Sequence, residues 1–353
     1  MKLSDICDVY SGYAFKTFND LGHGVPVIKI SNLLPDGSIN LINCLFTTEN
    51  IKEKYYSKKS DIYIALSGAT TGKISIMDKD NTFAINQRVG IVRNRSTIPN
   101  EYLKYFLMSK SNRILEEASG CAQPNISPKQ IANHDVPIYS DAVINKIVSE
   151  LREIDKIKNT YQKQLELLDE LVKARFVEMF GEIEDCDKWE SKIWNEVVTI
   201  KNGRDYKKVL VSDGGYPVVG TGGEIARASK YLCPENTIVV GRKGSINNPM
   251  LMKEKFWNVD TAFGVIPNSD YLHYQYFYCF CKFYNFMKLN KATTLPSTTK
   301  ADLLKIRINI PPLELQNQFA SFVQEIDKSR SRIQKSLEAS QELFDSLMQK
   351  YFG

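Results

Sequence analysis

Hydrophobic positions recur at alternating three- and four-residue steps in two long segments, 141–181 and 313–353. This spacing is the a/d pattern of a coiled-coil helix. The first seam comprises Ile144, Ile147, Leu151, Ile154, Lys158, Tyr161, Leu165, Leu168, Val172, Arg175 and Met179. The second comprises Gln316, Phe319, Val323, Ile326, Arg330, Ile333, Leu337, Ser340, Phe344, Leu347 and Tyr351. Because a polar a position fixes register at a cost in stability, we predict that Lys158 and Arg330 help to set the pairing.

Short β-branched and aromatic runs, separated by Gly, Pro, Asn and Asp, precede each long segment. Such runs are typical of strands joined by turns. They include VPVIKI, DIYIAL and RVGIV in the first half of the chain and YPVVG, TIVVG and AFGVI in the second. The stretches EYLKYFLMSKSNRILEEA and YQYFYCFCKFYNFMKL are expected to form helices that pack on these strands. The pattern therefore predicts an α+β fold for both globular parts.

An internal repeat relates the two halves of the chain at an offset of 172 residues. The block EIDK at 153–156 recurs at 325–328, and Phe180-Gly181 recurs at the carboxyl end. The same offset places Gly72 on Gly244 and Pro124 on Pro296. The repeat predicts a globular domain at 1–140, a helix at 141–181, a second globular domain at 182–312 and a second helix at 313–353.

The lengths of the two predicted helices constrain how they pair. A helix of about 39 residues is roughly 58 Å long. The second helix must therefore run back along the first, which predicts an antiparallel coiled coil with a globular domain at each end. Two similar modules held at a fixed separation suit the reading of two DNA half-sites on one face of the duplex.

Composition narrows the class of protein without deciding it. The 353 residues carry a net charge of +5, which is compatible with phosphate contacts if the charge is clustered. Seven cysteines form neither a disulfide framework nor a zinc pattern, and His23, His134 and His273 lack metal-ligand spacing. No apolar run approaches the roughly 20 residues that span a bilayer, so we expect a cytoplasmic protein.

The stretch SGATTGKIS at 67–75 resembles a phosphate-binding loop only superficially. That loop needs four residues between its glycines and a Ser or Thr after the lysine. Here three residues separate Gly68 from Gly72, and Ile74 follows Lys73. The spacing argues against ATP binding and leaves a small, polar, lysine-tipped loop to be explained.

The whole chain resembles the specificity subunit of type I restriction–modification systems. The resemblance rests on the two-copy plan and on four stretches of sequence. These are SGYAFKTFNDLGHGVPVIKISNL at 11–33, KNGRDYKKVLVSDGGYPVVGTGG at 201–223, GRKGSINNPMLMKEKFWNVDTAFGVI at 241–266 and PPLELQNQ at 311–318.

The resemblance implies that each globular part is a target-recognition domain that reads one half of a bipartite site in double-stranded DNA. The helices then set the gap and dock two methyltransferase (modification) subunits, and restriction subunits join that core. S-adenosylmethionine, ATP and Mg would belong to these partners. The chain itself would have no catalytic residues; NNPM at 247–250, for example, lacks the aromatic of an amino-methyltransferase site.

Candidate DNA-binding residues follow from the resemblance and from readout chemistry, in which Arg or Lys pairs with guanine and Asn or Gln with adenine. The loop GRKGSINN at 241–248 is the expected counterpart of SGATTGKIS. The candidates are Lys16, Thr70, Thr71, Lys73, Asn86, Gln87, Arg88, Gln123, Asn125, Tyr206, Lys207, Arg242, Lys243, Ser245, Asn247, Thr298 and Lys300.

Two other interpretations remain open at this stage. The chain could be a coiled-coil assembly protein that never touches DNA, in which case neutralising Lys73, Arg242 and Lys243 would leave its function unchanged. It could also serve a related system in which methylation and cleavage share one partner polypeptide.

Overall fold

The fold is described from a computed structural model of the chain, covering residues 1–353 except 35, 43, 78–81, 119–123, 184–187 and 292–294. The described residues form two compact units. One contains Met1–Thr160 with Ser336–Gly353, and the other contains Tyr161–Lys335. Each unit mixes strands and helices, so the predicted α+β class is confirmed.

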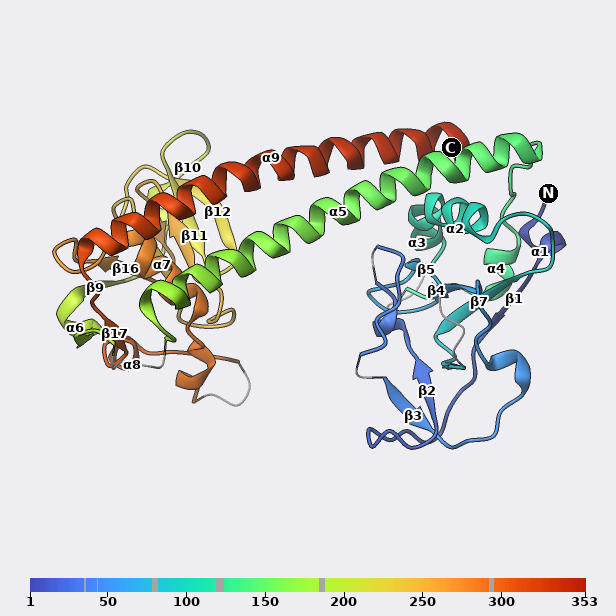
Figure 1. The fold of residues 1–353 in the computed structure, drawn as a ribbon, viewed down its shortest axis with the longest axis horizontal. Coiled ribbons are helices and arrows are strands. Elements are labelled where there is room, and N and C mark those ends of the chain that lie inside the picture. Colours follow the sequence, from blue (N-terminus) through green and yellow to red (C-terminus); the bar gives the residue numbers. More distant parts are fainter. Residues whose placement is uncertain (35, 43, 78–81, 119–123, 184–187, 292–294) are drawn as a thin grey trace. The chain divides into compact units, whose positions relative to one another are not determined.

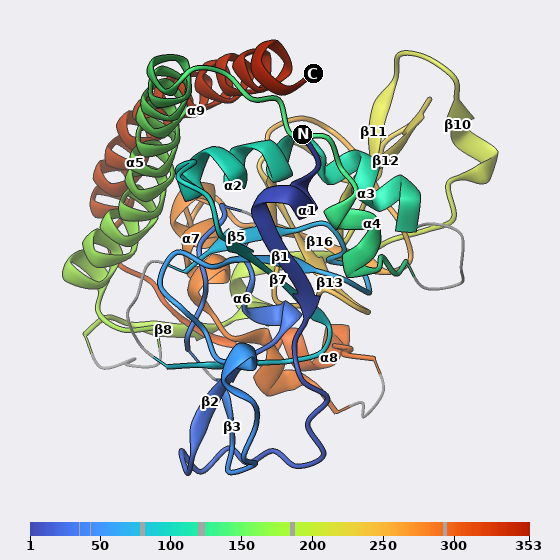
Figure 2. The same ribbon diagram turned by 90° about the vertical axis from the view of Figure 1, so that its right-hand side faces the viewer.

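The first globular domain is built on a four-stranded antiparallel sheet. Its order is β1 (Cys7–Ser11), β7 (Val89–Asn94), β4 (Ile62–Ala65) and β5 (Ile74–Ile76). Four helices contribute to the core on one face: α1 (Leu3–Ile6), α2 (Asn100–Ser109), α3 (Ser111–Ala118) and α4 (Pro128–Ala132). Figures 1 and 2 show α2 on one side of this sheet and β2 and β3 on the other.

A smaller sheet completes the first domain. Its strands are β3 (Leu45–Thr47), β2 (Val25–Ile28) and β6 (Ala84–Ile85), with β2 and β6 parallel. Two short 3-10 turns, η1 (Ile30–Asn32) and η2 (Glu53–Tyr55), lie in its connections. Ile28 and Ile85 pack with Tyr63 and Ile91 of the larger sheet, so the second face of that sheet is buried too.

The second domain repeats this plan. Its larger sheet has the order β9 (Val198–Asn202), β16 (Ala262–Pro267), β13 (Thr237–Gly241) and β14 (Met250–Met252). The smaller sheet contains β10 (Leu210–Val211), β12 (Gly223–Ala228), β11 (Tyr216–Gly220) and β15 (Trp257–Asn258). The remaining elements are β8 (Ser191–Ile193), α6 (Trp194–Val197), η3 (Lys207–Val209), α7 (Tyr274–Phe283), η4 (Phe286–Leu289), α8 (Lys300–Leu303) and β17 (Arg307–Asn309).

The two long helices, α5 (Asp141–Phe180) and α9 (Leu313–Phe352), lie side by side (Figure 1). In the first unit, Leu151 near the start of α5 shares a core with Phe344 near the end of α9. In the second unit, Phe176 near the end of α5 shares a core with Phe319 near the start of α9. The helices therefore run antiparallel, as predicted.

All predicted seam positions are buried or half-buried. The central positions, among them Leu165, Leu168, Ile326 and Leu337, are only half-buried. The Lys158 ammonium lies 4.1 Å from the centre of the Phe344 ring. Arg330 instead donates to Asp169, with Nη2 3.0 Å from Oδ1. That these two residues set the pairing stays a prediction.

The carboxyl end of α9 packs on the first globular domain, and the carboxyl end of α5 packs on the second. Phe352 of α9 packs on Tyr102 of α2, with ring centres 5.2 Å apart. Phe180 of α5 packs on Tyr276 of α7 at 4.7 Å. Each globular domain is thus held by the helix that follows it in sequence and by the last turn of the other one, which explains why Phe-Gly recurs at both helix ends.

Candidate nucleic-acid interface

Three polar loops of the first domain meet at one end of its larger sheet. We call them the glycine loop (66–73), the turn loop (86–88) and the proline loop (124–127), and their assembly the three-loop edge. The Leu66 amide donates to the Arg88 carbonyl at 2.9 Å, and the Ile126 amide donates to the Leu66 carbonyl at 2.9 Å. The Gly68 amide donates to the Pro124 carbonyl at 3.1 Å. Loops far apart in sequence are therefore joined through their backbones.

The second domain builds the same edge with the same bonds. Its glycine loop is 242–249, its turn loop 259–261 and its proline loop 296–299. The Arg242 amide donates to the Thr261 carbonyl at 2.8 Å, and the Thr298 amide donates to the Arg242 carbonyl at 3.0 Å. The Gly244 amide donates to the Pro296 carbonyl at 2.9 Å. The glycine and proline loops, which the repeat matches between the two domains, are thus joined to each other within each domain.

These bonds correct one predicted correspondence. Gly244 matches Gly68 and not Gly72, because both amides donate to the proline-loop carbonyl. Both residues have positive φ, 84° and 83°, which favours glycine at this turn. A constant offset fails here because the domains differ in the lengths of their connections, whereas Pro124 and Pro296 do match as predicted.

Several predicted side chains of the three-loop edge face solvent. In the first domain Gln87, Arg88 and Asn125 are exposed and Lys73 is half-buried. In the second domain the exposed side chains are Arg242, Lys243 and Ser245. Cations therefore project from both edges, and amides project from the edge of the first domain.

Other predicted side chains hold the edge together. The Thr71 hydroxyl donates to the Gly68 carbonyl at 2.7 Å, and the Thr298 hydroxyl donates to the Gly241 carbonyl at 2.9 Å. Asn247 Oδ1 accepts from the Phe286 amide at 2.8 Å, and the Lys300 ammonium donates to the Ile200 carbonyl at 2.8 Å. Asn86 is buried and accepts from the Arg88 amide at 3.2 Å. The sequence did not indicate these internal bonds.

Two hydroxyls in the glycine loop of the first domain make no hydrogen bond of this kind. Ser67 Oγ and Thr70 Oγ1 are inaccessible to solvent and have no hydrogen-bond partner within the described part of the chain. Buried hydroxyls normally find a protein or water partner, so these two atoms mark a place where the loop has unused hydrogen-bonding capacity. Gln123, also predicted for this region, lies outside the described residues.

The remaining candidates lie outside the three loops, in connections next to the smaller sheets. Lys16 is exposed, and its amide and that of Thr17 both donate to Glu49 Oε1 at 2.8 Å. The bond from the Thr17 amide holds the pKa of Glu49 below its usual value. In the second domain Lys207 is exposed, while Tyr206 packs in a small cluster with Trp257.

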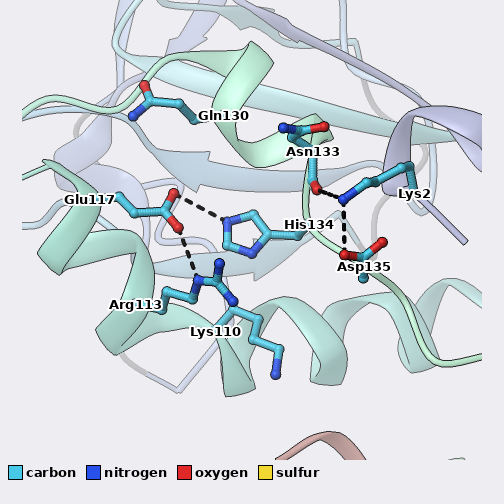
Figure 3. A pocket seen from close by; sticks show the side chains of 8 residues that line it. All are labelled: Lys2, Lys110, Arg113, Glu117, Gln130, Asn133, His134 and Asp135. Carbon is cyan, nitrogen blue, oxygen red and sulfur yellow. Dashed lines mark hydrogen bonds and ion pairs between the residues drawn. The ribbon is translucent and has the colours of Figure 1, made fainter.

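A polar cavity of about 380 Å³ in the first domain was not predicted from the sequence (Figure 3). It is lined by Lys2, Lys110, Arg113, Glu117, Gln130, Asn133, His134 and Asp135. Most of its charges are already paired: Lys2 with Asp135 at 2.9 Å and Arg113 with Glu117 at 3.0 Å. Burial lowers the pKa of His134, whose Nε2 lies 3.6 Å from Glu117. Because its ions pair with each other, this cavity is a weaker candidate than the three-loop edge.

Two other kinds of site find no support in the described residues. No three His, Cys, Asp or Glu side chains there are grouped so that they could hold a metal ion. The helices among them include none that is both long and apolar enough to cross a membrane.

Comparisons with known proteins agree with this architecture. Residues 1–167 and 186–341 match the family described as the type I restriction modification DNA specificity domain. The type I restriction enzyme MjaVIII specificity subunit of Methanocaldococcus jannaschii is 28% identical over 183 residues. That match covers 49% of this chain and 43% of the relative, so it spans less than half of the relative's length.

Two solved structures have the same fold. The S subunit of a type I restriction–modification system from M. genitalium superposes with a TM-score of 0.59 at 16% identity, covering 100% of this chain and 95% of that one. A chain from a study of assembly and conformational transition of the type I R-M system gives 0.55 at 15% identity, covering 100% and 96%.

Proposed function

The chain belongs to the type I restriction modification DNA specificity family, and on that premise we propose that it is a non-catalytic subunit that selects the DNA sequence for a restriction–modification complex. Each globular domain reads one half of a bipartite site. The observation that carries this proposal is the three-loop edge, because both domains build it with the same backbone bonds and present different side chains from it.

The chemistry of the edge supports contact with double-stranded DNA. Lys73 and Lys243 are suited to phosphate oxygens, and Arg88, Arg242 and Asn125 carry the groups that pair with base edges in the major groove. Because backbone bonds already fix these loops, little backbone entropy is lost when they bind. Exposed cations at the same edge of both domains favour DNA binding over a role in protein assembly alone.

We propose further that α5 and α9 set the gap between the half-sites and dock two modification subunits. Large apolar side chains on these helices are exposed: Leu167 is 50% exposed, Leu171 46% and Leu343 52%. Such side chains gain from being covered by a partner. S-adenosylmethionine for methyl transfer, and ATP with Mg for restriction, are then bound by the partner subunits.

Mapping of modified bases tests this function. The chain is co-expressed with the modification subunit encoded beside it in a host that lacks DNA methylation, and methylated positions are located across the genome by single-molecule sequencing. We expect one motif of two short, different half-sites separated by a fixed unspecified gap. A stable complex with an active partner that methylates no defined motif would favour the assembly interpretation and contradict the proposal.

A further inference from the structure

Just beyond the last register pair of each larger sheet, one backbone hydrogen bond joins the glycine loop to the turn loop. In the first domain β4 and β7 are in register at Ala65 and Val89. The next pair is Leu66 and Arg88, joined by the bond from the Leu66 amide to the Arg88 carbonyl. Leu66 is 4% exposed and packs in the core on the α2 side, whereas Arg88 is exposed.

In the equivalent pair of the second domain, the glycine loop and not the turn loop supplies the arginine. There β13 and β16 are in register at Gly241 and Ala262. The next pair is Arg242 and Thr261, joined by the same amide-to-carbonyl bond. Arg242 therefore occupies the place of Leu66, and Thr261 the place of Arg88.

Each pair lies one residue beyond the last register pair of its sheet, where Arg88 and Thr261 are turn residues, and the backbone bond keeps its two members adjacent. Arg88 and Arg242 thus start from nearly the same point of their domains, although different loops supply them. The Arg242 guanidinium carbon lies 5.9 Å from the centre of the Phe263 ring, a residue of the core on the α7 side. Its Nη1 donates to the Asp260 carbonyl at 3.4 Å, which restrains the side chain.

We infer that Arg88 and Arg242 are counterpart specificity-determining residues, and that each reads a guanine in the half-site of its own domain. The inference rests on the proposed function and adds the residue and the base. A guanidinium offers two parallel N–H donors that match O6 and N7 of guanine in the major groove. Because the arginine comes from a different loop in each domain, the guanine is expected at a comparable depth in both half-sites but in a different sequence context.

The test compares the methylation motif of the full chain, in complex with its modification subunit, with the motifs of Arg88→Gln and Arg242→Gln. We expect Arg88→Gln to relax the requirement for a G·C pair at one position of one half-site, and Arg242→Gln to do so in the other half-site only. Discrimination at that position should fall about tenfold or more.

Matched controls lie away from the edge. Arg95 follows the opposite end of β7, where it pairs with Asp8, and Arg307 lies in β17. Arg95→Gln and Arg307→Gln should leave both half-sites unchanged. In addition, the double variant Arg242→Leu with Thr261→Arg moves the guanidinium to the position that Arg88 has in the first domain. It should keep a G·C requirement that Arg242→Leu alone loses.

Three outcomes would overturn the inference while leaving the proposed function intact. They are a wild-type half-site without any G·C pair, a motif that stays unchanged in both glutamine variants, and a uniform loss of methylation that keeps the motif. The last would mean that the arginines contact phosphates, with a salt dependence of binding reduced by about one unit in slope. A wild-type map without two half-sites would instead overturn the proposed function and this inference with it.

Discussion

The first and second domains share a backbone plan and differ in what that plan presents to solvent. The strand order of the larger sheet is the same in both domains. The backbone bonds that join the three loops also link matching positions in the two domains. Where the glycine loop meets the turn loop, however, Leu66 and Arg88 are replaced by Arg242 and Thr261. The repeat retains the backbone bonds that join the three loops, while the side chains presented from them differ.

A second difference concerns how the long helices are anchored. In the second unit Phe176 is 2% exposed and contacts four aromatic rings, those of Phe180, Tyr276, Phe283 and Phe319. The repeat places Met348 at the corresponding position of the first unit, where it is 8% exposed. The same helix-to-domain contact is therefore made by an aromatic cluster in one unit and by a flexible thioether in the other.

The largest effect is expected at this pair of positions. Phe176→Ala should lower the free energy of unfolding by about 3–5 kcal/mol, because it leaves a cavity inside the aromatic cluster. Met348→Ala should cost nearer to about 2 kcal/mol, since its neighbours can close around the smaller side chain. Denaturant unfolding of the full chain measures both values. An equal or larger cost for Met348→Ala would contradict the assigned difference in anchoring.

A smaller effect is expected at a buried position where the two domains carry different residues. The Leu3 amide donates to the His134 carbonyl and the Trp194 amide to the Ile306 carbonyl, so His134 and Ile306 correspond. Burial lowers the pKa of His134, so the unfolded chain binds a proton more readily than the folded one. His134 therefore contributes to stability above its unfolded pKa of about 6.5, and this contribution is lost as the pH falls through that value toward the folded pKa.

Thermal unfolding at pH values from 8 to 5 checks this titration. His134→Gln keeps a polar side chain in the cavity but cannot gain a charge there. We expect its unfolding temperature to decline less steeply on acidification than that of the unsubstituted protein. Parallel curves for the two proteins would show that His134 does not couple protonation to folding.

Much of this architecture could be predicted from the sequence because it follows from periodicity. The three- and four-residue steps located both helices and every seam position, and the β-branched runs located the principal strands. The three loops were also singled out, since small and polar residues between apolar runs indicate turns. That they meet at one edge was not predicted, because it depends on backbone bonds such as Leu66 to Arg88 between loops distant in sequence.

Periodicity could not show which loop residues of the first domain match which loop residues of the second. The offset between matching residues falls from 191 at Leu3 and Trp194 to 172 at His134 and Ile306, because connections in the first domain are longer. A fixed offset therefore matched the proline loops and mismatched the glycine loops. The sequence also could not show that the Thr71 and Thr298 hydroxyls bond to carbonyls inside the edge. A threonine in a loop can point to solvent or inward, and the sequence is the same in both cases.

A chimaera with two copies of the first domain tests whether each domain reads its own half-site. In it, residues 182–312 are replaced by a second copy of residues 1–140 between the native α5 and α9, and its methylation motif is mapped with the modification subunit. If each domain reads its own half-site, the motif should consist of one half-site of the native motif twice, as an inverted repeat because α5 and α9 run antiparallel. Retention of the native asymmetric motif, or of one continuous site, would contradict the account.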